Sequence, residues 1–201
     1  MALRGFVGFD SFAWDAPLKW GSLCGKNHLI VMSTETDIII RHLINEDVEL
    51  MRSLLRVFGD AFDEVETYCG AQPSSDYLRR LLSNENFIAL AALKHGEVVG
   101  GLAAYELQKF EQERGEIYIY DLAVSAAHRR EGIATALIQV LKSIGAQRRV
   151  YVVFVQTDIG DEPAIELYTK FGAREDVLHF DIAVNEDGDL YHLHYSFLHV
   201  S

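Results

Sequence analysis

Apolar and polar positions along the chain alternate between two periods, and their order predicts one α/β domain. Strand-like runs with period-two or continuous apolar character cover residues 37–43, 87–94, 97–108, 116–124 and 150–156. Apolar side chains at helical spacing predict helices over residues 45–62, from Ser74 or Ser75 to Leu82, over 132–147 and over 161–173. The strand, helix, strand order of residues 116–156 implies a parallel crossover unit.

Turn and capping residues punctuate this pattern. His95-Gly96 separates two strands by the two residues of a tight hairpin. Asn45 and Asp161 are the expected caps of the helices that follow them, and Gly172 ends the last helix. The link over residues 65–73 is expected to be a loop. The nearly continuous apolar run of 150–156 is typical of a strand covered on both faces.

The two ends of the chain lack so clear a period. Residues 1–32 are expected to be an extension that is either disordered or an artefact of the assigned start, with Met32 as an alternative start. Residues 33–183 form the predicted domain, which ends with a strand over 176–184. Residues 184–201 are a tail in which alternating Tyr191, Leu193, Tyr195 and Phe197 favour one added strand.

Composition and charge narrow the classes of function. The chain has 201 residues, 49% of them hydrophobic, which is enough for one sizeable core. It carries 18 basic and 30 acidic residues, so its formal charge is −12. This balance disfavours nucleic acid or an anionic membrane as a partner and suits a cationic ligand.

The cysteines and the N-terminal residues indicate the cellular compartment in which the protein is expected to work. Cys24 and Cys69 are too few for a disulfide framework and lack metal-ligand spacing, so we expect no metal and a reducing cytoplasm. Asp10 and Asp15 interrupt any signal-peptide core, and no apolar run is long enough for a membrane helix. A soluble protein is expected.

One junction carries the strongest chemical signal. The segment RREGIA, residues 129–134, lies between a predicted strand and a predicted helix. Unpaired backbone N–H groups and the positive end of the helix dipole can hold a phosphate there, and Gly132 permits close approach. Alone the motif is a weak signal, because a glycine at a helix start often serves only the turn.

With its neighbours, the junction resembles the GNAT superfamily of N-acetyltransferases, whose Q/R-x-x-G-x-G/A signature matches Arg129, Gly132 and Ala134. More narrowly, EIYIYDLAV, HRREGIATALI, the segment VYVVFVQTDIGDEPAIELYTKFGAREDV and HFDI resemble the aminoglycoside 3-N-acetyltransferases of type I. FIALAAL, GGLAAYEL and KFEQ extend the match, which covers about residues 54–182.

The resemblance implies a fold and a site for acetyl-CoA. The fold would be an α/β (α+β) GNAT fold, with a central mixed, splayed sheet flanked by helices. The strand over 117–124 would diverge from that over 150–156 and leave a cleft in which pantetheine pairs with free backbone groups. The implied cofactor contacts are Leu122, Ala123 and Val124 along the strand, and Arg129, Arg130, Glu131, Gly132, Ile133 and Ala134 around the pyrophosphate.

It also implies two catalytic residues. Tyr168 occupies the position of a general acid for the departing thiolate, with packing as its alternative role. Asp121 would lie near the accepting amine, either as a base or as an anchor for its charge; a structural hydrogen bond is the alternative. Many relatives carry Asn where this chain has Asp161, which favours a capping or substrate-binding role for that residue.

Acidic residues give partial independent support for a cationic substrate. Asp158, Asp161, Glu162, Glu166, Glu175 and Asp176 follow the last apolar strand, and a second group holds Asp60, Asp63, Glu64 and Glu66. Such runs are commonly solvated faces. The substrate contacts that we expect are Tyr120, Asp121, Asp158, Asp161, Glu175 and Asp176.

The resulting hypothesis is acetyl transfer from acetyl-CoA to the 3-amino group of an aminoglycoside, which would confer antibiotic resistance. Acetylation of a polyamine or another small cationic amine is the alternative, and a noncatalytic acyl-CoA sensor is an alternative of another class. The resemblance also implies a homodimer.

Overall fold

The structure is a computed structural model that describes residues 19–21, 30–32, 37–180 and 182, the first two segments by their backbone alone. The chain divides into two compact units, Met1–Glu162 and Pro163–Ser201. The first holds the whole described sheet and five of the described helical segments. The second begins with most of the last helix.

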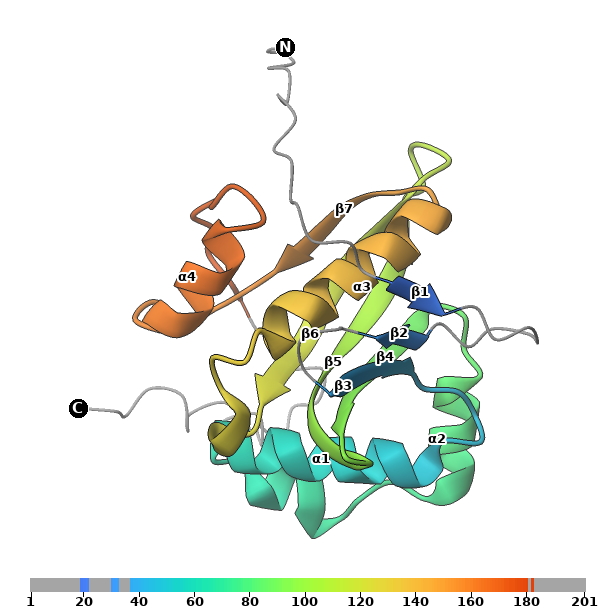
Figure 1. Cartoon of the computed structure of the whole chain (residues 1–201). Coiled ribbons are helices and arrows are strands. Elements are labelled where there is room, and N and C mark those ends of the chain that lie inside the picture. The colour runs from blue at the N-terminus through green and yellow to red at the C-terminus, as the bar shows by residue number, and fades with distance from the viewer. Residues whose placement is uncertain (1–18, 22–29, 33–36, 181, 183–201) are drawn as a thin grey trace, which may run out of the picture. The chain divides into compact units, whose positions relative to one another are not determined.

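The first unit is built on one seven-stranded mixed sheet in the order β1-β2-β3-β4-β5-β6-β7 (Figure 1). All neighbouring strands are antiparallel except β6 and β7, which are parallel. The strands are β1 (Lys19–Gly21), β2 (Ile30–Met32), β3 (Ile38–His42), β4 (Phe87–Lys94), β5 (Glu97–Gln108), β6 (Gly115–Val124) and β7 (Val150–Val155). The sequence analysis predicts β3 to β7, whereas β1 and β2 lie in the segment expected to precede the fold.

Helices cover the two faces of this sheet and create two cores. The helical elements are α1 (Val48–Phe62), η1 (Glu66–Gly70), α2 (Ser75–Leu82), η2 (Ala126–His128), α3 (Ile133–Gln147) and α4 (Glu162–Thr169). One core joins Leu137 and Leu141 of α3 to Ile117 of β6. The other joins Leu54 and Phe58 of α1 and Leu78 of α2 to the opposite face. The β6-α3-β7 unit is the predicted parallel crossover.

Local signals fixed several boundaries as predicted. His95 and Gly96 have φ angles of 52° and 87°, and Lys94 pairs with Glu97 across them, so the two-residue hairpin is confirmed. Ser74 caps α2, because its side chain accepts a hydrogen bond from the Tyr77 N–H at 3.2 Å.

The predicted cap of α1 is wrong. The helix begins at Val48, and Asp47 rather than Asn45 precedes it. The buried Asp47 carboxylate pairs with Arg41 at 2.5 Å and accepts the Ile44 N–H at 3.1 Å. Because this ion pair joins β3 to the turn before α1, it places the helix start two residues later than an Asn45 cap would.

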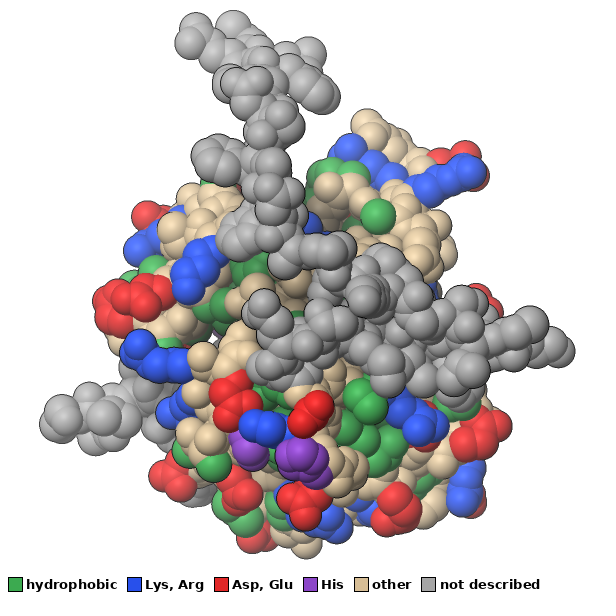
Figure 2. Space-filling view, viewed as in Figure 1, with side chains coloured by type: hydrophobic (Ala, Val, Ile, Leu, Met, Phe, Trp, Pro, Cys, Tyr) green, Lys and Arg blue, Asp and Glu red, His purple; other side chains and the backbone are tan. Residues whose placement is uncertain are grey.

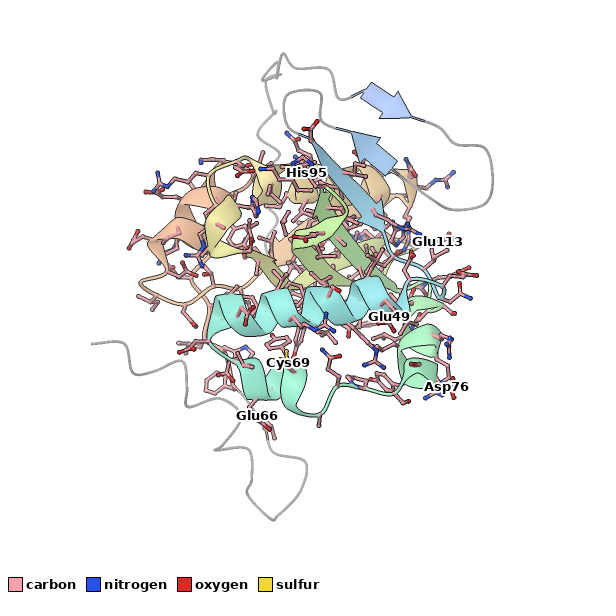
Figure 3. The ribbon with its side chains drawn as sticks, turned by 60° about the horizontal axis from the view of Figure 1, so that its bottom comes forward. Glu49, Glu66, Cys69, Asp76, His95 and Glu113 are labelled. Carbon is pink, nitrogen blue, oxygen red and sulfur yellow. The ribbon has the colours of Figure 1, made fainter. Side chains whose placement is uncertain are left out.

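The expected loop over residues 65–73 contains the π-helical turn η1. This turn packs on the side of α1, where a Cβ atom at Gly59 would lie 3.3 Å from Tyr68 Cβ and 3.4 Å from Cys69 Sγ. In Figure 3, Cys69 lies on the side of η1 nearest α1, while Glu66 points away. The absence of a side chain at Gly59 therefore allows this close approach.

The expectation that residues 150–156 are covered on both faces is also wrong. Tyr151, Val152 and Phe154 are exposed. The physical reason is the position of β7 at the end of the described sheet, beyond β4, β5 and β6, against which α1 packs. Half of its apolar side chains thus remain uncovered.

In the second unit, α4 ends at Thr169, and the Gly172 N–H bonds the Tyr168 carbonyl at 3.1 Å. Residues 176–180 and 182 are irregular, so the strand predicted over 176–184 does not form in its described part. No strand pairs with these described residues, which leaves the backbone without a ladder. The added strand expected at Tyr191–Phe197 lies outside the described residues. No helix among the described residues is long and apolar enough to cross a membrane.

Candidate active site

An irregularity in β6 determines which way the candidate acid faces. Ala103 of β5 pairs with Asp121, but Ala104 pairs with Ile119, so Tyr120 is an additional residue on β6. This bulge reverses the alternation of the strand. Ile117 and Ile119 pack in the core beneath α3, whereas Ala123 packs in the core of α1. Asp121 therefore turns toward the α1 side of the sheet.

Tyr68 of η1 meets Asp121 on that side. Its hydroxyl donates a hydrogen bond of 3.2 Å to Asp121 Oδ1. Burial raises the pKa of Asp121 from 3.8 to about 6, and the Tyr68 hydrogen bond opposes this rise. A carboxyl group with a pKa in this range is ionised at neutral pH and basic enough to accept a proton there. Asp121 thus has the properties expected of a general base.

Tyr68 has no signal in the sequence that marks it as a site residue. The segment VETYCGAQP shows neither period, so nothing in it distinguishes this tyrosine from an exposed one. The separation of 53 residues between Tyr68 and Asp121 removes any local signal. Only the packing of η1 on α1 reveals the pair.

The second feature of the site is a divergence between the two parallel strands. The pairing of β6 with β7 ends at Ile119 and Val155, although β6 continues to Val124. Residues 121–124 pair with β5 on one side and with no described strand on the other. This open edge includes Leu122, Ala123 and Val124, so the splayed sheet is confirmed. An extended ligand could form main-chain hydrogen bonds there.

The segment after β6 presents donors to an anion. Gly132 has a φ angle of 79° and precedes α3, whose first hydrogen bond runs from the Ala136 N–H to the Gly132 carbonyl. The N–H groups of residues 133–135 therefore lie before the intrahelical ladder. No atom lies within 4 Å of a Cβ built at Gly132, and Arg129 and Arg130 are exposed. These features fit a pyrophosphate group.

The Glu131 carboxylate contacts two other side chains of the protein. Its Oε2 accepts a hydrogen bond from Lys94 Nζ at 2.7 Å, and its Oε1 lies 3.2 Å from His128 Nδ1. Lys94, and secondarily His128, lowers the pKa of the Glu131 carboxyl. The end of β4 is therefore fastened to the segment that precedes α3, and the carboxylate is paired with the Lys94 ammonium rather than directed alone at an anion.

The remaining predicted site residues are less closely grouped. Tyr120 is 63% exposed beside Asp121, and Asp158 and Asp161 are exposed after β7. Tyr168, Glu175 and Asp176 belong to the second unit, where Tyr168 lies on α4.

The charges on the molecule are mixed rather than uniformly acidic. Asp176 is paired with Arg174 at 2.8 Å. Figure 2 shows acidic, basic and hydrophobic side chains intermixed on the viewed face. No group of three or more His, Cys, Asp or Glu side chains suited to a metal occurs within the described residues.

Comparisons with known proteins agree with this geometry. Residues 51–173 match the model of the acetyltransferase (GNAT) family. An aminoglycoside acetyltransferase from an uncultured soil metagenomic sample is 63% identical and has a TM-score of 0.72; the match covers 74% of this chain and 99% of that one.

Two more distant relatives were also found. A second aminoglycoside acetyltransferase from an uncultured soil metagenomic sample, solved in complex with sisomicin, is 31% identical, with a TM-score of 0.68 and coverage of 74% and 97%. N-alpha-acetyltransferase 60 of Xenopus tropicalis is 30% identical over 122 residues, which span 53% of this chain and only 46% of that protein.

Proposed function

Because this chain belongs to the GNAT acetyltransferase family, we propose that it transfers the acetyl group of acetyl-CoA to the 3-amino group of an aminoglycoside. The observation that carries the proposal is Asp121, a half-buried carboxylate with a pKa of about 6 beside the open edge of β6. The similarity to two aminoglycoside acetyltransferases, one of them 63% identical, supports the substrate class. The 3-amino position rests on the type I resemblance.

The first unit supplies the elements that would hold acetyl-CoA. Backbone groups of Leu122, Ala123 and Val124 would pair with the pantetheine chain. The N–H groups at the start of α3, with Arg129 and Arg130, would bind the pyrophosphate. When bound, acetyl-CoA supplies an activated acetyl group as a thioester. The open strand edge and the phosphate site would therefore contact two different parts of one elongated molecule.

Asp121 would then act on the acceptor. Its carboxylate takes a proton from the substrate ammonium, directly or through one water, and leaves a neutral amine. The amine nitrogen would form a bond to the thioester carbonyl carbon and lose a second proton to solvent, and the carbon–sulfur bond would break. Tyr168 donates its phenolic proton to the departing thiolate and recovers one from solvent. The exposed Tyr120, Asp158 and Asp161 and the second-unit residues Glu175 and Asp176 are proposed to contact the cationic substrate.

Polyamines and other small cationic amines are the alternative acceptors, because the acidic balance of the chain suits any polycation. A sensor that binds acyl-CoA without turnover would need no base, so Asp121 argues against it. We propose further that the enzyme works in the reducing cytoplasm as a homodimer and confers resistance; the free thiol of Cys69 suits that compartment.

A thiol-release assay with acetyl-CoA and a panel of aminoglycosides and polyamines tests this proposal. Turnover should be fastest with aminoglycosides, and NMR of the product should show an amide at the 3-amino nitrogen. Acetylation at another nitrogen would refute the regiochemistry, and a preference for polyamines would favour the alternative. Binding of acetyl-CoA without turnover of any amine would identify a sensor.

A further inference from the structure

We propose that Tyr68 is a positioning residue that orients Asp121 and favours its ionised form; this inference rests on the proposed function of Asp121 as the base. The hydroxyl donates to Oδ1 at 3.2 Å, and this is the only hydrogen bond that the Asp121 carboxylate makes to a described side chain. Oδ2 has no partner among the described residues and is not fully buried. One oxygen is thus fixed while the other can take a proton.

The ring of Tyr68 is itself held in place from several sides. Its centroid lies 5.9 Å from that of Phe58 and 5.9 Å from that of Phe62, both on α1. Its backbone N–H bonds the Glu64 carbonyl at 3.1 Å. The close approach permitted by Gly59 brings η1 against the same helix. The hydroxyl therefore projects toward β6 from a packed element rather than from a free loop.

The charges around the pair keep the proton on Tyr68. Burial, followed by the charge of Asp121, raises the pKa of the Tyr68 hydroxyl above its usual value. Tyr68 is therefore a neutral donor at every pH at which the enzyme would work. A hydrogen bond from a neutral donor to a carboxylate stabilises its ionised form, which counteracts the desolvation of Asp121.

The other titratable groups near the pair are three tyrosines and Glu64. Burial, and less so the charge of Asp121, raises the pKa of Tyr105 of β5 and of Tyr118 of β6. The ring of Tyr120 lies 6.0 Å from each of theirs. Glu64 acts on Tyr68 from the η1 side. No ion pair among the described residues joins Asp121 to a cation. Tyr68 is consequently the neighbour through which the acidity of Asp121 can be adjusted.

The test is the pH profile of kcat/KM for an aminoglycoside in Tyr68→Phe, which keeps the ring and removes the hydroxyl. Without the hydrogen bond the pKa of Asp121 rises. The acid limb of the profile, which is the fall in kcat/KM toward low pH, should therefore move to higher pH by roughly one unit. Activity at pH 6 should fall about fivefold more than activity at pH 8.5, since about half of the wild-type carboxyl is ionised at its pKa. A merely structural role would lower activity by one factor at all pH values.

Tyr105→Phe is the matched control. It removes a hydroxyl from a half-buried tyrosine of the same surroundings, and that hydroxyl makes no hydrogen bond to Asp121. The acid limb of this variant should stay at the wild-type position. A limb that moved equally in both variants would show a general effect of lost hydroxyl groups and would overturn the proposal.

Asp121→Asn separates this inference from the proposed function. If the wild-type acid limb persists in Asp121→Asn, Asp121 is not the base and the proposed function fails in that respect. If Asp121→Asn abolishes the limb but Tyr68→Phe leaves it in place, the base stands and the role of Tyr68 is refuted. In the double variant, Tyr68→Phe should add no pH-dependent loss; an additional loss would show that Tyr68 does not act through Asp121.

Discussion

At the scale of single residues, the properties of Asp121 arise from its surroundings rather than from its residue type. An exposed aspartate would have a pKa near 3.8, whereas burial raises this one to about 6. The raised pKa means that the folded protein holds the proton more tightly than the unfolded chain. The associated stability is present below about pH 4 and is lost as pH rises through about 6. A destabilising, ionised carboxylate at neutral pH is a feature expected of functional sites.

Asp121→Asn should therefore separate activity from stability. We expect kcat/KM for an aminoglycoside to fall by roughly two orders of magnitude, the scale of positioned acid–base catalysis. The free energy of unfolding at pH 8 should be equal to or above that of the wild type, by at most roughly 3 kcal/mol, because a desolvated charge is gone. Steady-state kinetics and thermal melts at pH 4 and 8 measure both effects.

Wild-type turnover in Asp121→Asn would exclude the role of Asp121 as the base. If the variant failed to fold, the hydrogen bond between Tyr68 and Asp121 would be shown to be primarily structural. A loss confined to KM would identify Asp121 as an anchor for the cationic substrate.

At the scale of elements, the start of α3 combines a strained backbone with open space. Gly132 lies at a φ angle of 79°, and Arg130 at 65° also occupies the left-handed region. Both residues lie directly before the helix, and the N–H groups of residues 133–135 precede its first intrahelical hydrogen bond. The Lys94–Glu131 pair fastens this segment to the end of β4.

Gly132→Val should weaken acetyl-CoA binding while the protein remains folded. A branched side chain is strained at this φ angle, by about 1–2 kcal/mol, and it would occupy the space beside the donors. Calorimetry measures the affinity. Gly96→Val is the control, because Gly96 has a φ angle of 87° and equally open surroundings in the hairpin; it should lose similar stability but keep its acetyl-CoA affinity. Equal affinities in both variants would exclude α3 as the phosphate site.

Lys94→Met should raise the KM for acetyl-CoA about fivefold and change kcat little, since it leaves the Glu131 carboxylate unneutralised beside the phosphate site. Adding Glu131→Gln should restore the KM, because the uncompensated charge is then removed. A KM that stays high in the double variant would attribute the effect to lost packing of Lys94 instead of to charge.

At the scale of the whole molecule, the described sheet extends further toward the N-terminus than the domain expected from the sequence. β2 pairs with β3 through Ile30 to Met32, and β1 pairs with β2. These strands adjoin the edge of the sheet remote from β6 and β7 in the strand order. They would thus contribute to stability more than to the site.

Deleting residues 1–31 should lower the melting temperature and preserve kcat/KM at 25 °C. The deletion removes β1 and most of β2, so β3 loses its ladder on one side, while Asp121 and the start of α3 keep their described partners. Differential scanning calorimetry and the thiol-release assay compare the two proteins. A large loss of activity in a folded truncated protein would show that the N-terminal strands contribute to the site.

The sequence by itself determined the elements whose signals are local. Periodicity specified α3 and the strands on either side of it, and His95-Gly96 specified the hairpin. Gly132 marked the start of a helix whose first N–H groups have no intrahelical partner. The tertiary structure decided the rest. The bulge at Tyr120 reverses the alternation of β6, so regular alternation from Ile117 and Ile119 would have placed Asp121 on the wrong face.

The partnership of Tyr68 with Asp121 spans 53 residues and depends on the packing of η1 against α1. Likewise, the Arg41–Asp47 pair displaced the start of α1 from the local cap signal at Asn45. Short-range propensity encodes neither a bulge nor a long-range contact, because both depend on how neighbouring strands and helices compete for the same buried surface. The sequence therefore determined which residues were chemically suited to the site, and the fold decided how Asp121 faces and what sets its pKa.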